Sequence, residues 1–305
     1  MPQLASTSLI FGCGYLGLRL AKRLVDRGQV VYATTRKTAN LAPLAADGMR
    51  PLLLSITQPV TFASARPALE ADSLDVYYLI PPGRPDQSPS PRQTVLGGVA
   101  HTLKQLRRTN LRRAVLTSST AVYGHHNGLR VDAHTNPDPV DDRGRLLLAG
   151  EDLWRNAGKS YRIVRLAGLY GPGRIIGMAG VRQGAPLVGD PQALINLIHV
   201  DDAVELVMAV MMSENAEQVE LACDGTPVPR IDYYRHLAQR IGVSPPPVLN
   251  DADAAAQLGL KRERLNRSSS KSLDNIGTCQ RTGWTPNYPN FRVGLETALA
   301  KSKNQ

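Results

Sequence analysis

The feature that most constrains the fold of this chain is a glycine-rich turn near its N-terminus, Gly12-Cys13-Gly14-Tyr15-Leu16-Gly17. An apolar run at residues 9–11 precedes the turn, apolar residues at helical spacing follow over residues 18–25, and a second apolar run occupies residues 30–33. These flanks predict a strand, a tight turn, a helix and a second strand.

Each glycine of the turn has a mechanical role in such a unit. Gly12 permits the tight turn, Gly14 leaves the backbone open to a pyrophosphate, and Gly17 lets the helix pack closely on the strand. The first N–H groups of the helix and its partial positive charge favour phosphate at the same place. The segment therefore predicts a dinucleotide-binding unit, and the alternative is a glycine-rich turn that arises by chance.

The end of the second predicted strand bears on which dinucleotide binds. The sequence there is Thr34-Thr35-Arg36-Lys37, with no carboxylate to accept hydrogen bonds from the ribose hydroxyls. An Arg would stabilise a 2′-phosphate, whereas an Asp would repel it. We therefore expect NADP rather than NAD, with Arg36 and Lys37 at the phosphate. The alternative is that both side chains only solvate an exposed loop.

Composition narrows the class of protein. The chain has 305 residues with 42% hydrophobic residues, enough for a large core in one or two domains. Its cysteines, Cys13, Cys223 and Cys279, show neither metal-ligand spacing nor a disulfide framework, so we expect a cytoplasmic protein without a metal site. The N-terminal sequence does not resemble a signal peptide, and no apolar run approaches membrane-spanning length.

The formal net charge of +10 raises the question of a polyanionic partner. The basic residues form two clusters: Lys104, Arg107, Arg108, Arg112 and Arg113, then Lys261, Arg262, Arg264 and Arg267. Aromatic residues do not interleave with them, which disfavours nucleic-acid binding. The second cluster either faces the ligand pocket, where it would suit an anionic substrate, or serves surface solubility.

Alternation of apolar strands and helical stretches predicts the fold class. Strands are expected near residues 52–54, 75–80, 113–118 and 161–166, with helices between them. This pattern is typical of an α/β Rossmann fold, a doubly wound parallel sheet with helices on both faces. We expect a nucleotide-binding domain over residues 1–170 and a smaller substrate lobe over residues 171–305 that partly returns to the sheet.

Ligands of such sheets bind outside the carboxyl ends of the strands. Residues 12–17, 80–83, 118–124 and 166–173 should therefore converge on one crevice. The residues expected at the cofactor are Gly12, Gly14, Tyr15, Leu16, Gly17, Arg36, Lys37, Ile80, Pro81, Pro82, Ser118 and Leu166.

Four segments together resemble the extended short-chain dehydrogenase/reductase family, the group of NAD-dependent epimerases and dehydratases. Besides the glycine turn, they are Ser118-Ser119-Thr120-Ala121-Val122-Tyr123-Gly124, the segment from Arg165 to Arg174 with Tyr170-Gly171-Pro172-Gly173, and Asn196-Leu197-Ile198-His199-Val200-Asp201-Asp202. They occur in family order over most of the chain. The segment Gly283-Trp284-Thr285-Pro286 further resembles the atypical bacterial branch called YeeZ-like.

The resemblance implies a catalytic Tyr-x-x-x-Lys motif that this chain lacks. Counted back from Glu151, the family's usual helix Glu, the Tyr place holds Arg143 and the Lys place holds Leu147. Leu147 cannot hold a ribose hydroxyl electrostatically, and Arg143 cannot act as a general acid near neutral pH. Either the standard hydride chemistry is lost or other residues perform it.

The remaining candidates follow from the same resemblance. Ser119 matches the family's Ser that orients the substrate oxygen, and Tyr123 and Arg143 are further catalytic candidates. Tyr123 alternatively packs beside the cofactor, and Arg143 alternatively lies on a surface loop. Ser119, His199 and Arg174 are expected at the substrate, although His199 alternatively only begins the helix that follows it.

Two functions remain open at this point. The chain is expected to be an NAD(P)-binding oxidoreductase or epimerase/dehydratase-like enzyme acting on a small, anionic molecule. The alternative is a non-catalytic NADP-binding sensor or regulator, which the missing Tyr and Lys favour. The resemblance also implies a homodimer, because relatives often pair through two helices of the nucleotide-binding domain.

Overall fold

The computed structural model describes residues 7–84, 86, 88–124, 126–258 and 270–302. Within them, a sheet of seven parallel strands has the order β12-β7-β5-β4-β1-β2-β3. The strands are β1 (Thr7–Phe11), β2 (Val30–Thr35), β3 (Arg50–Leu53), β4 (Leu74–Tyr78), β5 (Leu111–Ser119), β7 (Tyr161–Leu166) and β12 (Val219–Ala222). From β1 the chain adds β2 and β3 on one side of the sheet and then β4, β5, β7 and β12 on the other side. This strand order is that of a Rossmann fold and confirms the predicted α/β class.

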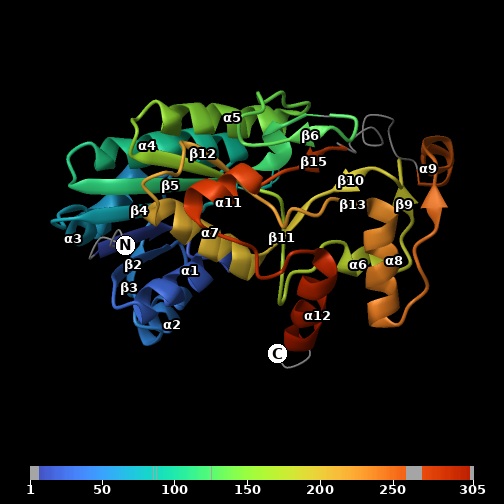
Figure 1. The fold of residues 1–305 in the computed structure, drawn as a ribbon. Coiled ribbons are helices and arrows are strands. Elements are labelled where there is room, and N and C mark those ends of the chain that lie inside the picture. Colours follow the sequence, from blue (N-terminus) through green and yellow to red (C-terminus); the bar gives the residue numbers. More distant parts are fainter. Residues whose placement is uncertain (1–6, 85, 87, 125, 259–269, 303–305) are drawn as a thin grey trace.

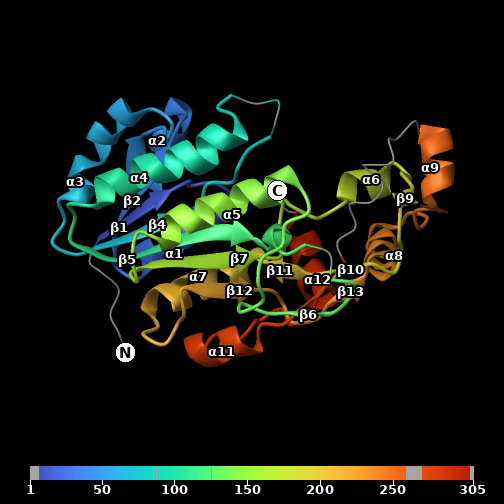
Figure 2. The same cartoon turned by 90° about the horizontal axis from the view of Figure 1, so that it is seen from above.

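Helices cover both faces of the sheet (Figure 1, Figure 2). On one face lie α4 (Gly98–Leu106) and α5 (Asp142–Arg155), and on the other lie α1 (Tyr15–Asp26) and α7 (Val200–Met212). Successive residues of β1 point to opposite faces, as the strand period requires. Leu9 and Phe11 therefore join the core under α4 and α5, whereas Ile10 joins the core under α1 and α7.

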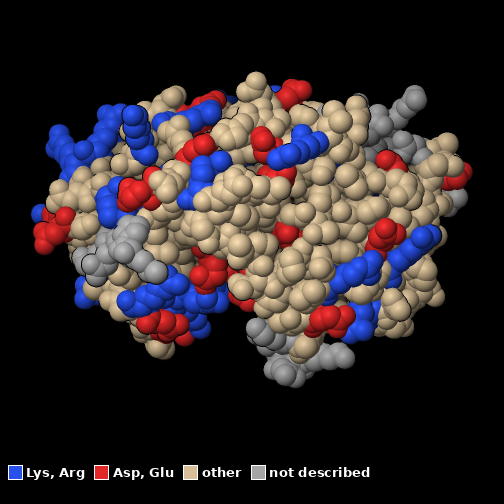
Figure 3. All heavy atoms as spheres, in the orientation of Figure 1, with Lys and Arg blue, Asp and Glu red and all other residues tan. Residues whose placement is uncertain are grey.

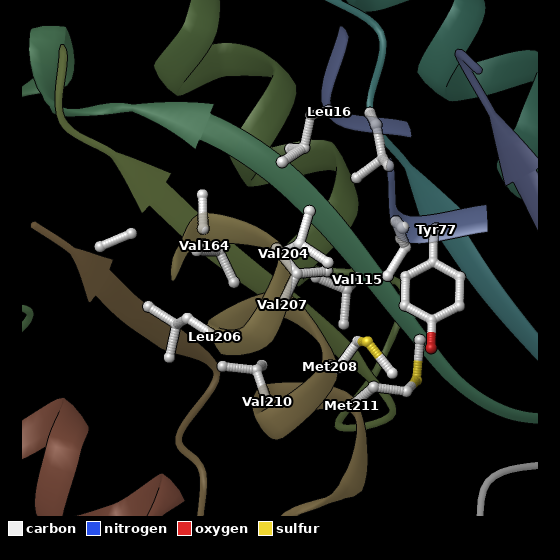
Figure 4. Close-up of a cluster of buried hydrophobic side chains, with 14 of the residues drawn as sticks. Leu16, Tyr77, Val115, Val164, Val204, Leu206, Val207, Met208, Val210 and Met211 are labelled. Atoms are coloured by element: carbon white, nitrogen blue, oxygen red, sulfur yellow. The ribbon is translucent and has the colours of Figure 1, made fainter. Parts of the chain in front are cut away.

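One cluster of buried hydrophobic side chains lies between α7 and the sheet (Figure 4). Val204, Val207 and Met208 of α7 lie against Val115 of β5 and Val164 of β7, and all five side chains are at most 1% exposed. Burial of each such side chain contributes about 1.5–3 kcal/mol. This packing fixes α7 and the β12 strand after it on the central sheet, although both come from the second half of the chain.

Most other elements of the second half form a lobe beside the carboxyl ends of the strands (Figure 1). Its strand pairs are β8 (Gly168–Tyr170) with β11 (Leu197–His199), β10 (Leu194–Ile195) with β13 (Val228–Pro229), β9 (Leu187–Val188) with β14 (Val248–Leu249), and β15 (Ser272–Leu273) with β6 (Arg130–Val131). Its helices are α6 (Met178–Arg182), α8 (Arg230–Ile241), α9 (Asp251–Leu258) and α12 (Phe291–Ser302), whereas α11 (Ile276–Thr282) packs against α7 and β12 of the central sheet. The division at residue 170 stays a prediction.

Short helical elements complete the first half. They are η1 (Thr38–Asn40), α2 (Leu41–Ala46), η2 (Pro59–Ala65), α3 (Arg66–Leu69), the π-helical η3 (Gln93–Gly97) and η4 (Thr120–Val122). Among them, η4 directly follows β5 at the carboxyl edge of the sheet.

The first basic cluster is partly structural. Arg112 pairs with the buried carboxylate of Asp75, with 2.5 Å between Nη2 and Oδ2. Arg113 is 8% exposed and donates to the carbonyl oxygens of Met211 and Ser213 at the end of α7. On much of the surface seen in the orientation of Figure 1, basic and acidic side chains are interspersed (Figure 3). The second cluster, at residues 261–267, lies outside the described residues.

Candidate functional site

The carboxyl ends of the strands surround a cavity of about 1180 Å³. Segments after β1, β2, β3, β4, β5 and β7 line it from the sheet, and segments around β10 and β15 line it from the lobe. Each of the four segments expected to converge reaches this cavity, through residues 12–16, 80–83, 118–121 and 166–169. Every residue expected at the cofactor lines this cavity except Gly17, which lies below the turn.

The glycine turn has the geometry that a dinucleotide requires. Gly12 has φ of +94°, and a β-carbon there would lie 2.8 Å from the Cγ1 atom of Ile80. A β-carbon on Gly14 would meet no atom within 4 Å, so the backbone at this glycine is open to the cavity. A β-carbon on Gly17 would lie 2.2 Å from the carbonyl oxygen of Gly12, which explains why the helix can approach only with glycine there.

The start of α1 offers an anion site above this turn. No side chain caps the helix, which begins at Tyr15 with Gly14 as its N-cap residue. Uncapped N–H groups at a helix start point outwards and carry partial positive charge, so they favour the phosphates of a dinucleotide. The residues present therefore fit this cofactor class.

The turn after β2 presents two cations to the same cavity. The Oγ1 atom of Thr35 accepts hydrogen bonds from the Lys37 N–H and the Asn40 side-chain amide, each at 3.2 Å, and this holds the turn in place. Arg36 and Lys37 are exposed and line the cavity. The described lining residues include five cations, namely Arg36, Lys37, Arg143, Arg174 and Lys271, and no Asp or Glu.

Ser118 and Ser119 lie at the end of β5 and line the cavity. The Oγ atom of Ser119 accepts a hydrogen bond from the Ala121 N–H at 3.2 Å, so its own proton stays available to a ligand. The Oγ atom of Ser118 is buried and has no hydrogen-bond partner within the described part of the chain. A buried hydroxyl of this kind is one that a bound molecule can satisfy.

Arg143 and Leu147, at the places of the missing Tyr and Lys, both line the cavity from the first turns of α5. Asp141 caps this helix, since its Oδ1 atom accepts a hydrogen bond from the Gly144 N–H at 2.7 Å. A β-carbon on Gly144 would lie 2.7 Å from the carbonyl oxygen of Ala121, so the helix start sits directly against η4. Arg143 therefore faces the site rather than only a surface loop.

Tyr123 is not among the cavity-lining residues. Its hydroxyl donates to the carbonyl oxygen of Asp132 at 2.9 Å and accepts from the Nη1 atom of Arg165 at 2.8 Å. Burial raises the pKa of this phenol. These contacts favour the structural alternative for Tyr123 over the catalytic one.

His199 and Arg174, both expected at the substrate, differ in placement. His199 is fully buried away from the cavity lining, where its Nδ1 atom accepts from the Asp201 N–H at 3.2 Å and begins α7. Its ring lies 3.9 Å from that of Tyr288, measured between centroids. This favours the alternative of a helix-starting residue. Arg174 does line the cavity, with its guanidinium 5.6 Å from the ring centroid of Tyr15.

Asn196, Tyr234 and Lys271 are among the lining residues that escaped the sequence analysis as site residues. Lys271 is 5% exposed, and its Nζ atom donates to the carbonyl oxygens of Tyr123 at 2.8 Å and Gly124 at 3.2 Å. Burial lowers the pKa of this amine to about 8. Asn196 accepts from the Leu273 N–H and donates to the Lys271 carbonyl, each at 2.9 Å. Asn196 is the first residue of the Asn196–Asp202 segment that carries part of the family resemblance, whereas nothing local marks Lys271.

Two further expectations concern metals and membranes. In the described ranges, no group of three or more His, Cys, Asp or Glu side chains is arranged to hold a metal ion. None of the helices described has the length and apolar character needed to cross a bilayer.

The chain resembles several known proteins. The family model of the NAD dependent epimerase/dehydratase family matches residues 9–222. Protein YeeZ of Escherichia coli K12 is 27% identical over 283 residues, which cover 92% of this chain and 95% of that protein.

Solved structures give the same picture. A conserved protein of unknown function from Silicibacter pomeroyi has 28% identity and a TM-score of 0.74, with coverage of 97% of this chain and 99% of that one. UDP-glucuronic acid 4-epimerase of Bacillus cereus in complex with NAD shares the fold, with a TM-score of 0.76, 18% identity and coverage of 98% and 99%. The match over residues 9–222 confirms the resemblance drawn from the four motifs, and the chain belongs to the NAD-dependent epimerase/dehydratase family.

Proposed function

We propose that this protein binds NADP in preference to NAD and acts as an oxidoreductase or epimerase-like enzyme on a small molecule. The observation that carries the proposal is that one cavity is lined by the open glycine turn, by Ser119 and by Arg143. Solved relatives of the same fold bind NAD. The dinucleotide would supply hydride exchange with a carbon of the substrate.

The residues of the chain divide into two roles in this proposal. The turn at Gly12–Gly17 and the start of α1 would hold the diphosphate, and Arg36 with Lys37 would hold the 2′-phosphate. Ser119 would donate its hydroxyl proton in a hydrogen bond to the reacting oxygen, which orients it. Arg143 would stabilise negative charge on that oxygen without giving up a proton.

A second candidate function is an NADP-binding sensor without turnover. The observation that favours it is Leu147, which lines the cavity at the place where the family's Lys holds the nicotinamide ribose. A leucine there supplies neither a hydrogen bond nor a charge. Under this alternative, ligand binding would matter through its effect on the protein rather than through chemistry.

Calorimetric titration with NADPH, NADP, NADH and NAD tests the binding of a dinucleotide, which both candidate functions require. Tighter binding of the phosphorylated pair supports the assignment of Arg36, and no binding of any of the four contradicts the proposal. NADPH consumption with a panel of small carbonyl compounds, compared between the wild type and Ser119→Ala, then separates enzyme from sensor. Loss of turnover in the variant with unchanged NADPH affinity supports the enzyme.

The cytoplasmic location and the homodimer stay predictions. Size-exclusion chromatography with light scattering on the purified protein tests whether it is a homodimer.

A further inference from the structure

Four half-buried side chains line the cavity from the lobe and form what we call the apolar wall. They are Ile176, Leu194, Ile195 and Tyr234. A concave surface that leaves several apolar side chains partly open to solvent is typical of a ligand site rather than of a packed interior.

Elements that are distant in the chain hold this wall together. Leu194 and Ile195 form β10, which pairs with β13, and β13 leads directly into α8, the helix of Tyr234. The hydroxyl of Tyr233 donates to the carbonyl oxygen of Ile176 at 3.0 Å, which ties Ile176 to the same helix. The wall is therefore formed by the fold itself.

The aromatic ring of Tyr234 is held in place by its neighbours. The ring of Tyr233 meets it edge-on, with 5.3 Å between the two centroids. It also packs against Gly177, where φ is +73° and a β-carbon would clash with the ring. Tyr234 thus offers a fixed aromatic surface to a ligand in the cavity.

A second cavity of about 350 Å³ adjoins the same ring. Tyr234 lines both cavities, so its ring stands between them. Val181 and Leu187 contribute apolar side chains to the second cavity, and the Nη1 atom of Arg230 in its lining donates to the Val188 carbonyl oxygen at 3.1 Å. Removal of the Tyr234 ring would join this space to the first cavity.

The described charged and amide side chains that line the cavity from the lobe already have protein partners. The Asn196 amide is held by the backbone of Leu273 and Lys271, and the Lys271 amine is itself held by carbonyl oxygens. The Arg174 guanidinium lies over the ring of Tyr15, beside the place proposed for the cofactor diphosphate. On this side of the cavity, the apolar wall is therefore left to hold the body of a substrate.

The first cavity has room for a substrate beside the cofactor. Its volume of about 1180 Å³ exceeds the roughly 300–1,000 Å³ that is typical of a pocket for one small ligand. The glycine turn, Ser119 and the apolar wall all line it.

We propose that the apolar wall binds the body of the substrate, an apolar ring system, and directs the carbonyl or hydroxyl group that it carries towards Ser119. The proposal rests on the proposed function, because it places the substrate beside the dinucleotide. The wall disfavours a sugar, whose hydroxyl groups would lose their hydrogen bonds to water against apolar side chains. An anionic group, expected from residues 261–267, stays a separate prediction.

Calorimetric titration of the full-length protein saturated with NADP tests this, because NADP cannot reduce a ketone and no turnover disturbs the measurement. The probes are 1-tetralone, an uncharged ketone with two fused rings, and UDP-glucose, a polar molecule with a diphosphate. We expect one saturable site per chain for 1-tetralone and at least about tenfold weaker binding of UDP-glucose.

Leu194→Asn puts an amide of similar size into the apolar wall, so it should weaken the binding of 1-tetralone about tenfold. Leu129→Asn is the matched control, since Leu129 is 67% exposed and does not line the cavity. That variant should bind 1-tetralone as the wild type does.

Two variants of Tyr234 test the ring itself. Tyr234→Phe keeps the ring and should bind 1-tetralone within about twofold of the wild type. Tyr234→Ala opens the second cavity, so it should favour the longer ketone 6-phenyl-1-tetralone. The ratio of its affinity to that of 1-tetralone should rise at least about tenfold over the wild-type ratio.

The outcomes separate the two proposals. If the protein binds no dinucleotide, the proposed function fails, and the same titration without NADP still tests the apolar wall. If NADP binds but 1-tetralone does not, or if UDP-glucose binds more tightly, the inference about the substrate is overturned.

Equal losses in Leu194→Asn and Leu129→Asn would overturn the inference as well. A loss in Tyr234→Phe as large as that in Tyr234→Ala would do the same, because it would assign binding to the hydroxyl rather than to the ring. Should Leu194→Asn fail to fold, the two variants of Tyr234 still decide.

Discussion

Glu151 on α5 and Arg165 on β7 form a buried ion pair, with 2.6 Å between the Oε2 atom of Glu151 and the Nη2 atom of Arg165. The side chains are 0% and 2% exposed, and the Nε atom of Arg165 donates to both carboxylate oxygens at 3.1 and 3.2 Å. The remaining arm of the guanidinium donates to the hydroxyl of Tyr123. One guanidinium thus joins α5, which carries Arg143, to β7 and to the turn after β5.

Glu151→Gln should lower the free energy of unfolding by about 3 kcal/mol or more, because it leaves the Arg165 charge buried without its partner. Urea unfolding followed by circular dichroism measures this. Asp152→Asn is the control on the neighbouring position, where the carboxylate pairs with Arg155 at the surface. That change should cost less than about 1 kcal/mol. Equal losses in both variants would contradict the role given to the buried pair.

Glu151 also explains why much of the site could be predicted from the sequence. Counting back from Glu151, the family's helix Glu, singled out Arg143 and Leu147, and both residues line the cavity from the first turns of α5. The ends of strands could also be predicted, here from the sequence pattern. Apolar runs with clear boundaries gave residues 161–166 as a strand, and β7 covers those residues.

What could not be predicted depends on contacts between distant parts of the chain. Tyr123 is only four residues from Ser119, yet its hydroxyl points away from the cavity because Arg165 and the Asp132 carbonyl hold it. Lys271 enters the same site from a position more than a hundred residues further along the chain. No local pattern marks it, because its burial follows from the pairing of β15 with β6.

The two glycines that flank Tyr15 and Leu16 should respond differently to replacement by alanine. Gly17→Ala places a methyl group 2.2 Å from a backbone oxygen, so we expect a loss of about 1–3 kcal/mol in the free energy of unfolding. Gly14→Ala meets no atom within 4 Å, and its cost should stay within about 1 kcal/mol.

Gly14→Ala, which should cost little stability, should nevertheless weaken the binding of NADPH. The added methyl group projects towards the expected path of the pyrophosphate, so Gly14→Ala should bind NADPH about tenfold more weakly while keeping nearly the wild-type stability. Calorimetry and urea unfolding on the same preparations measure both quantities. Wild-type affinity in Gly14→Ala would argue against a dinucleotide at this turn.

Arg36→Asp should reverse the preference between the two cofactors. The carboxylate would repel a 2′-phosphate and accept hydrogen bonds from the ribose hydroxyls of NADH, so the NADPH/NADH affinity ratio should fall at least about tenfold. Arg108→Asp makes the same change of charge at an exposed site that does not line the cavity. An unchanged ratio in Arg36→Asp, or an equal fall in both variants, would mean that Arg36 only solvates the loop.

Asp224 should make stability depend on pH in a direction opposite to that of an ion-paired carboxylate. Its side chain is 4% exposed, and burial, reinforced by the charge of Asp202, raises its pKa to about 7. Between the ordinary aspartate pKa and about 7, the folded protein therefore binds a proton that the unfolded chain does not bind. The free energy of unfolding contributed by this group falls as pH rises through that window.

Asp224→Asn removes the loss of stability that ionisation of this side chain causes at higher pH. An asparagine oxygen can still accept the hydrogen bond that the Thr226 N–H donates to the Oδ1 atom of Asp224 at 3.0 Å. Near pH 8 the variant should be more stable than the wild type by about 2 kcal/mol, and the difference should shrink towards pH 5. Urea unfolding at both pH values gives the two differences. Asp232→Asn, the same substitution at an exposed position on α8, is the matched control. A difference at Asp224 that stays constant with pH would show that its carboxylate is ionised throughout and held by a contact of another kind.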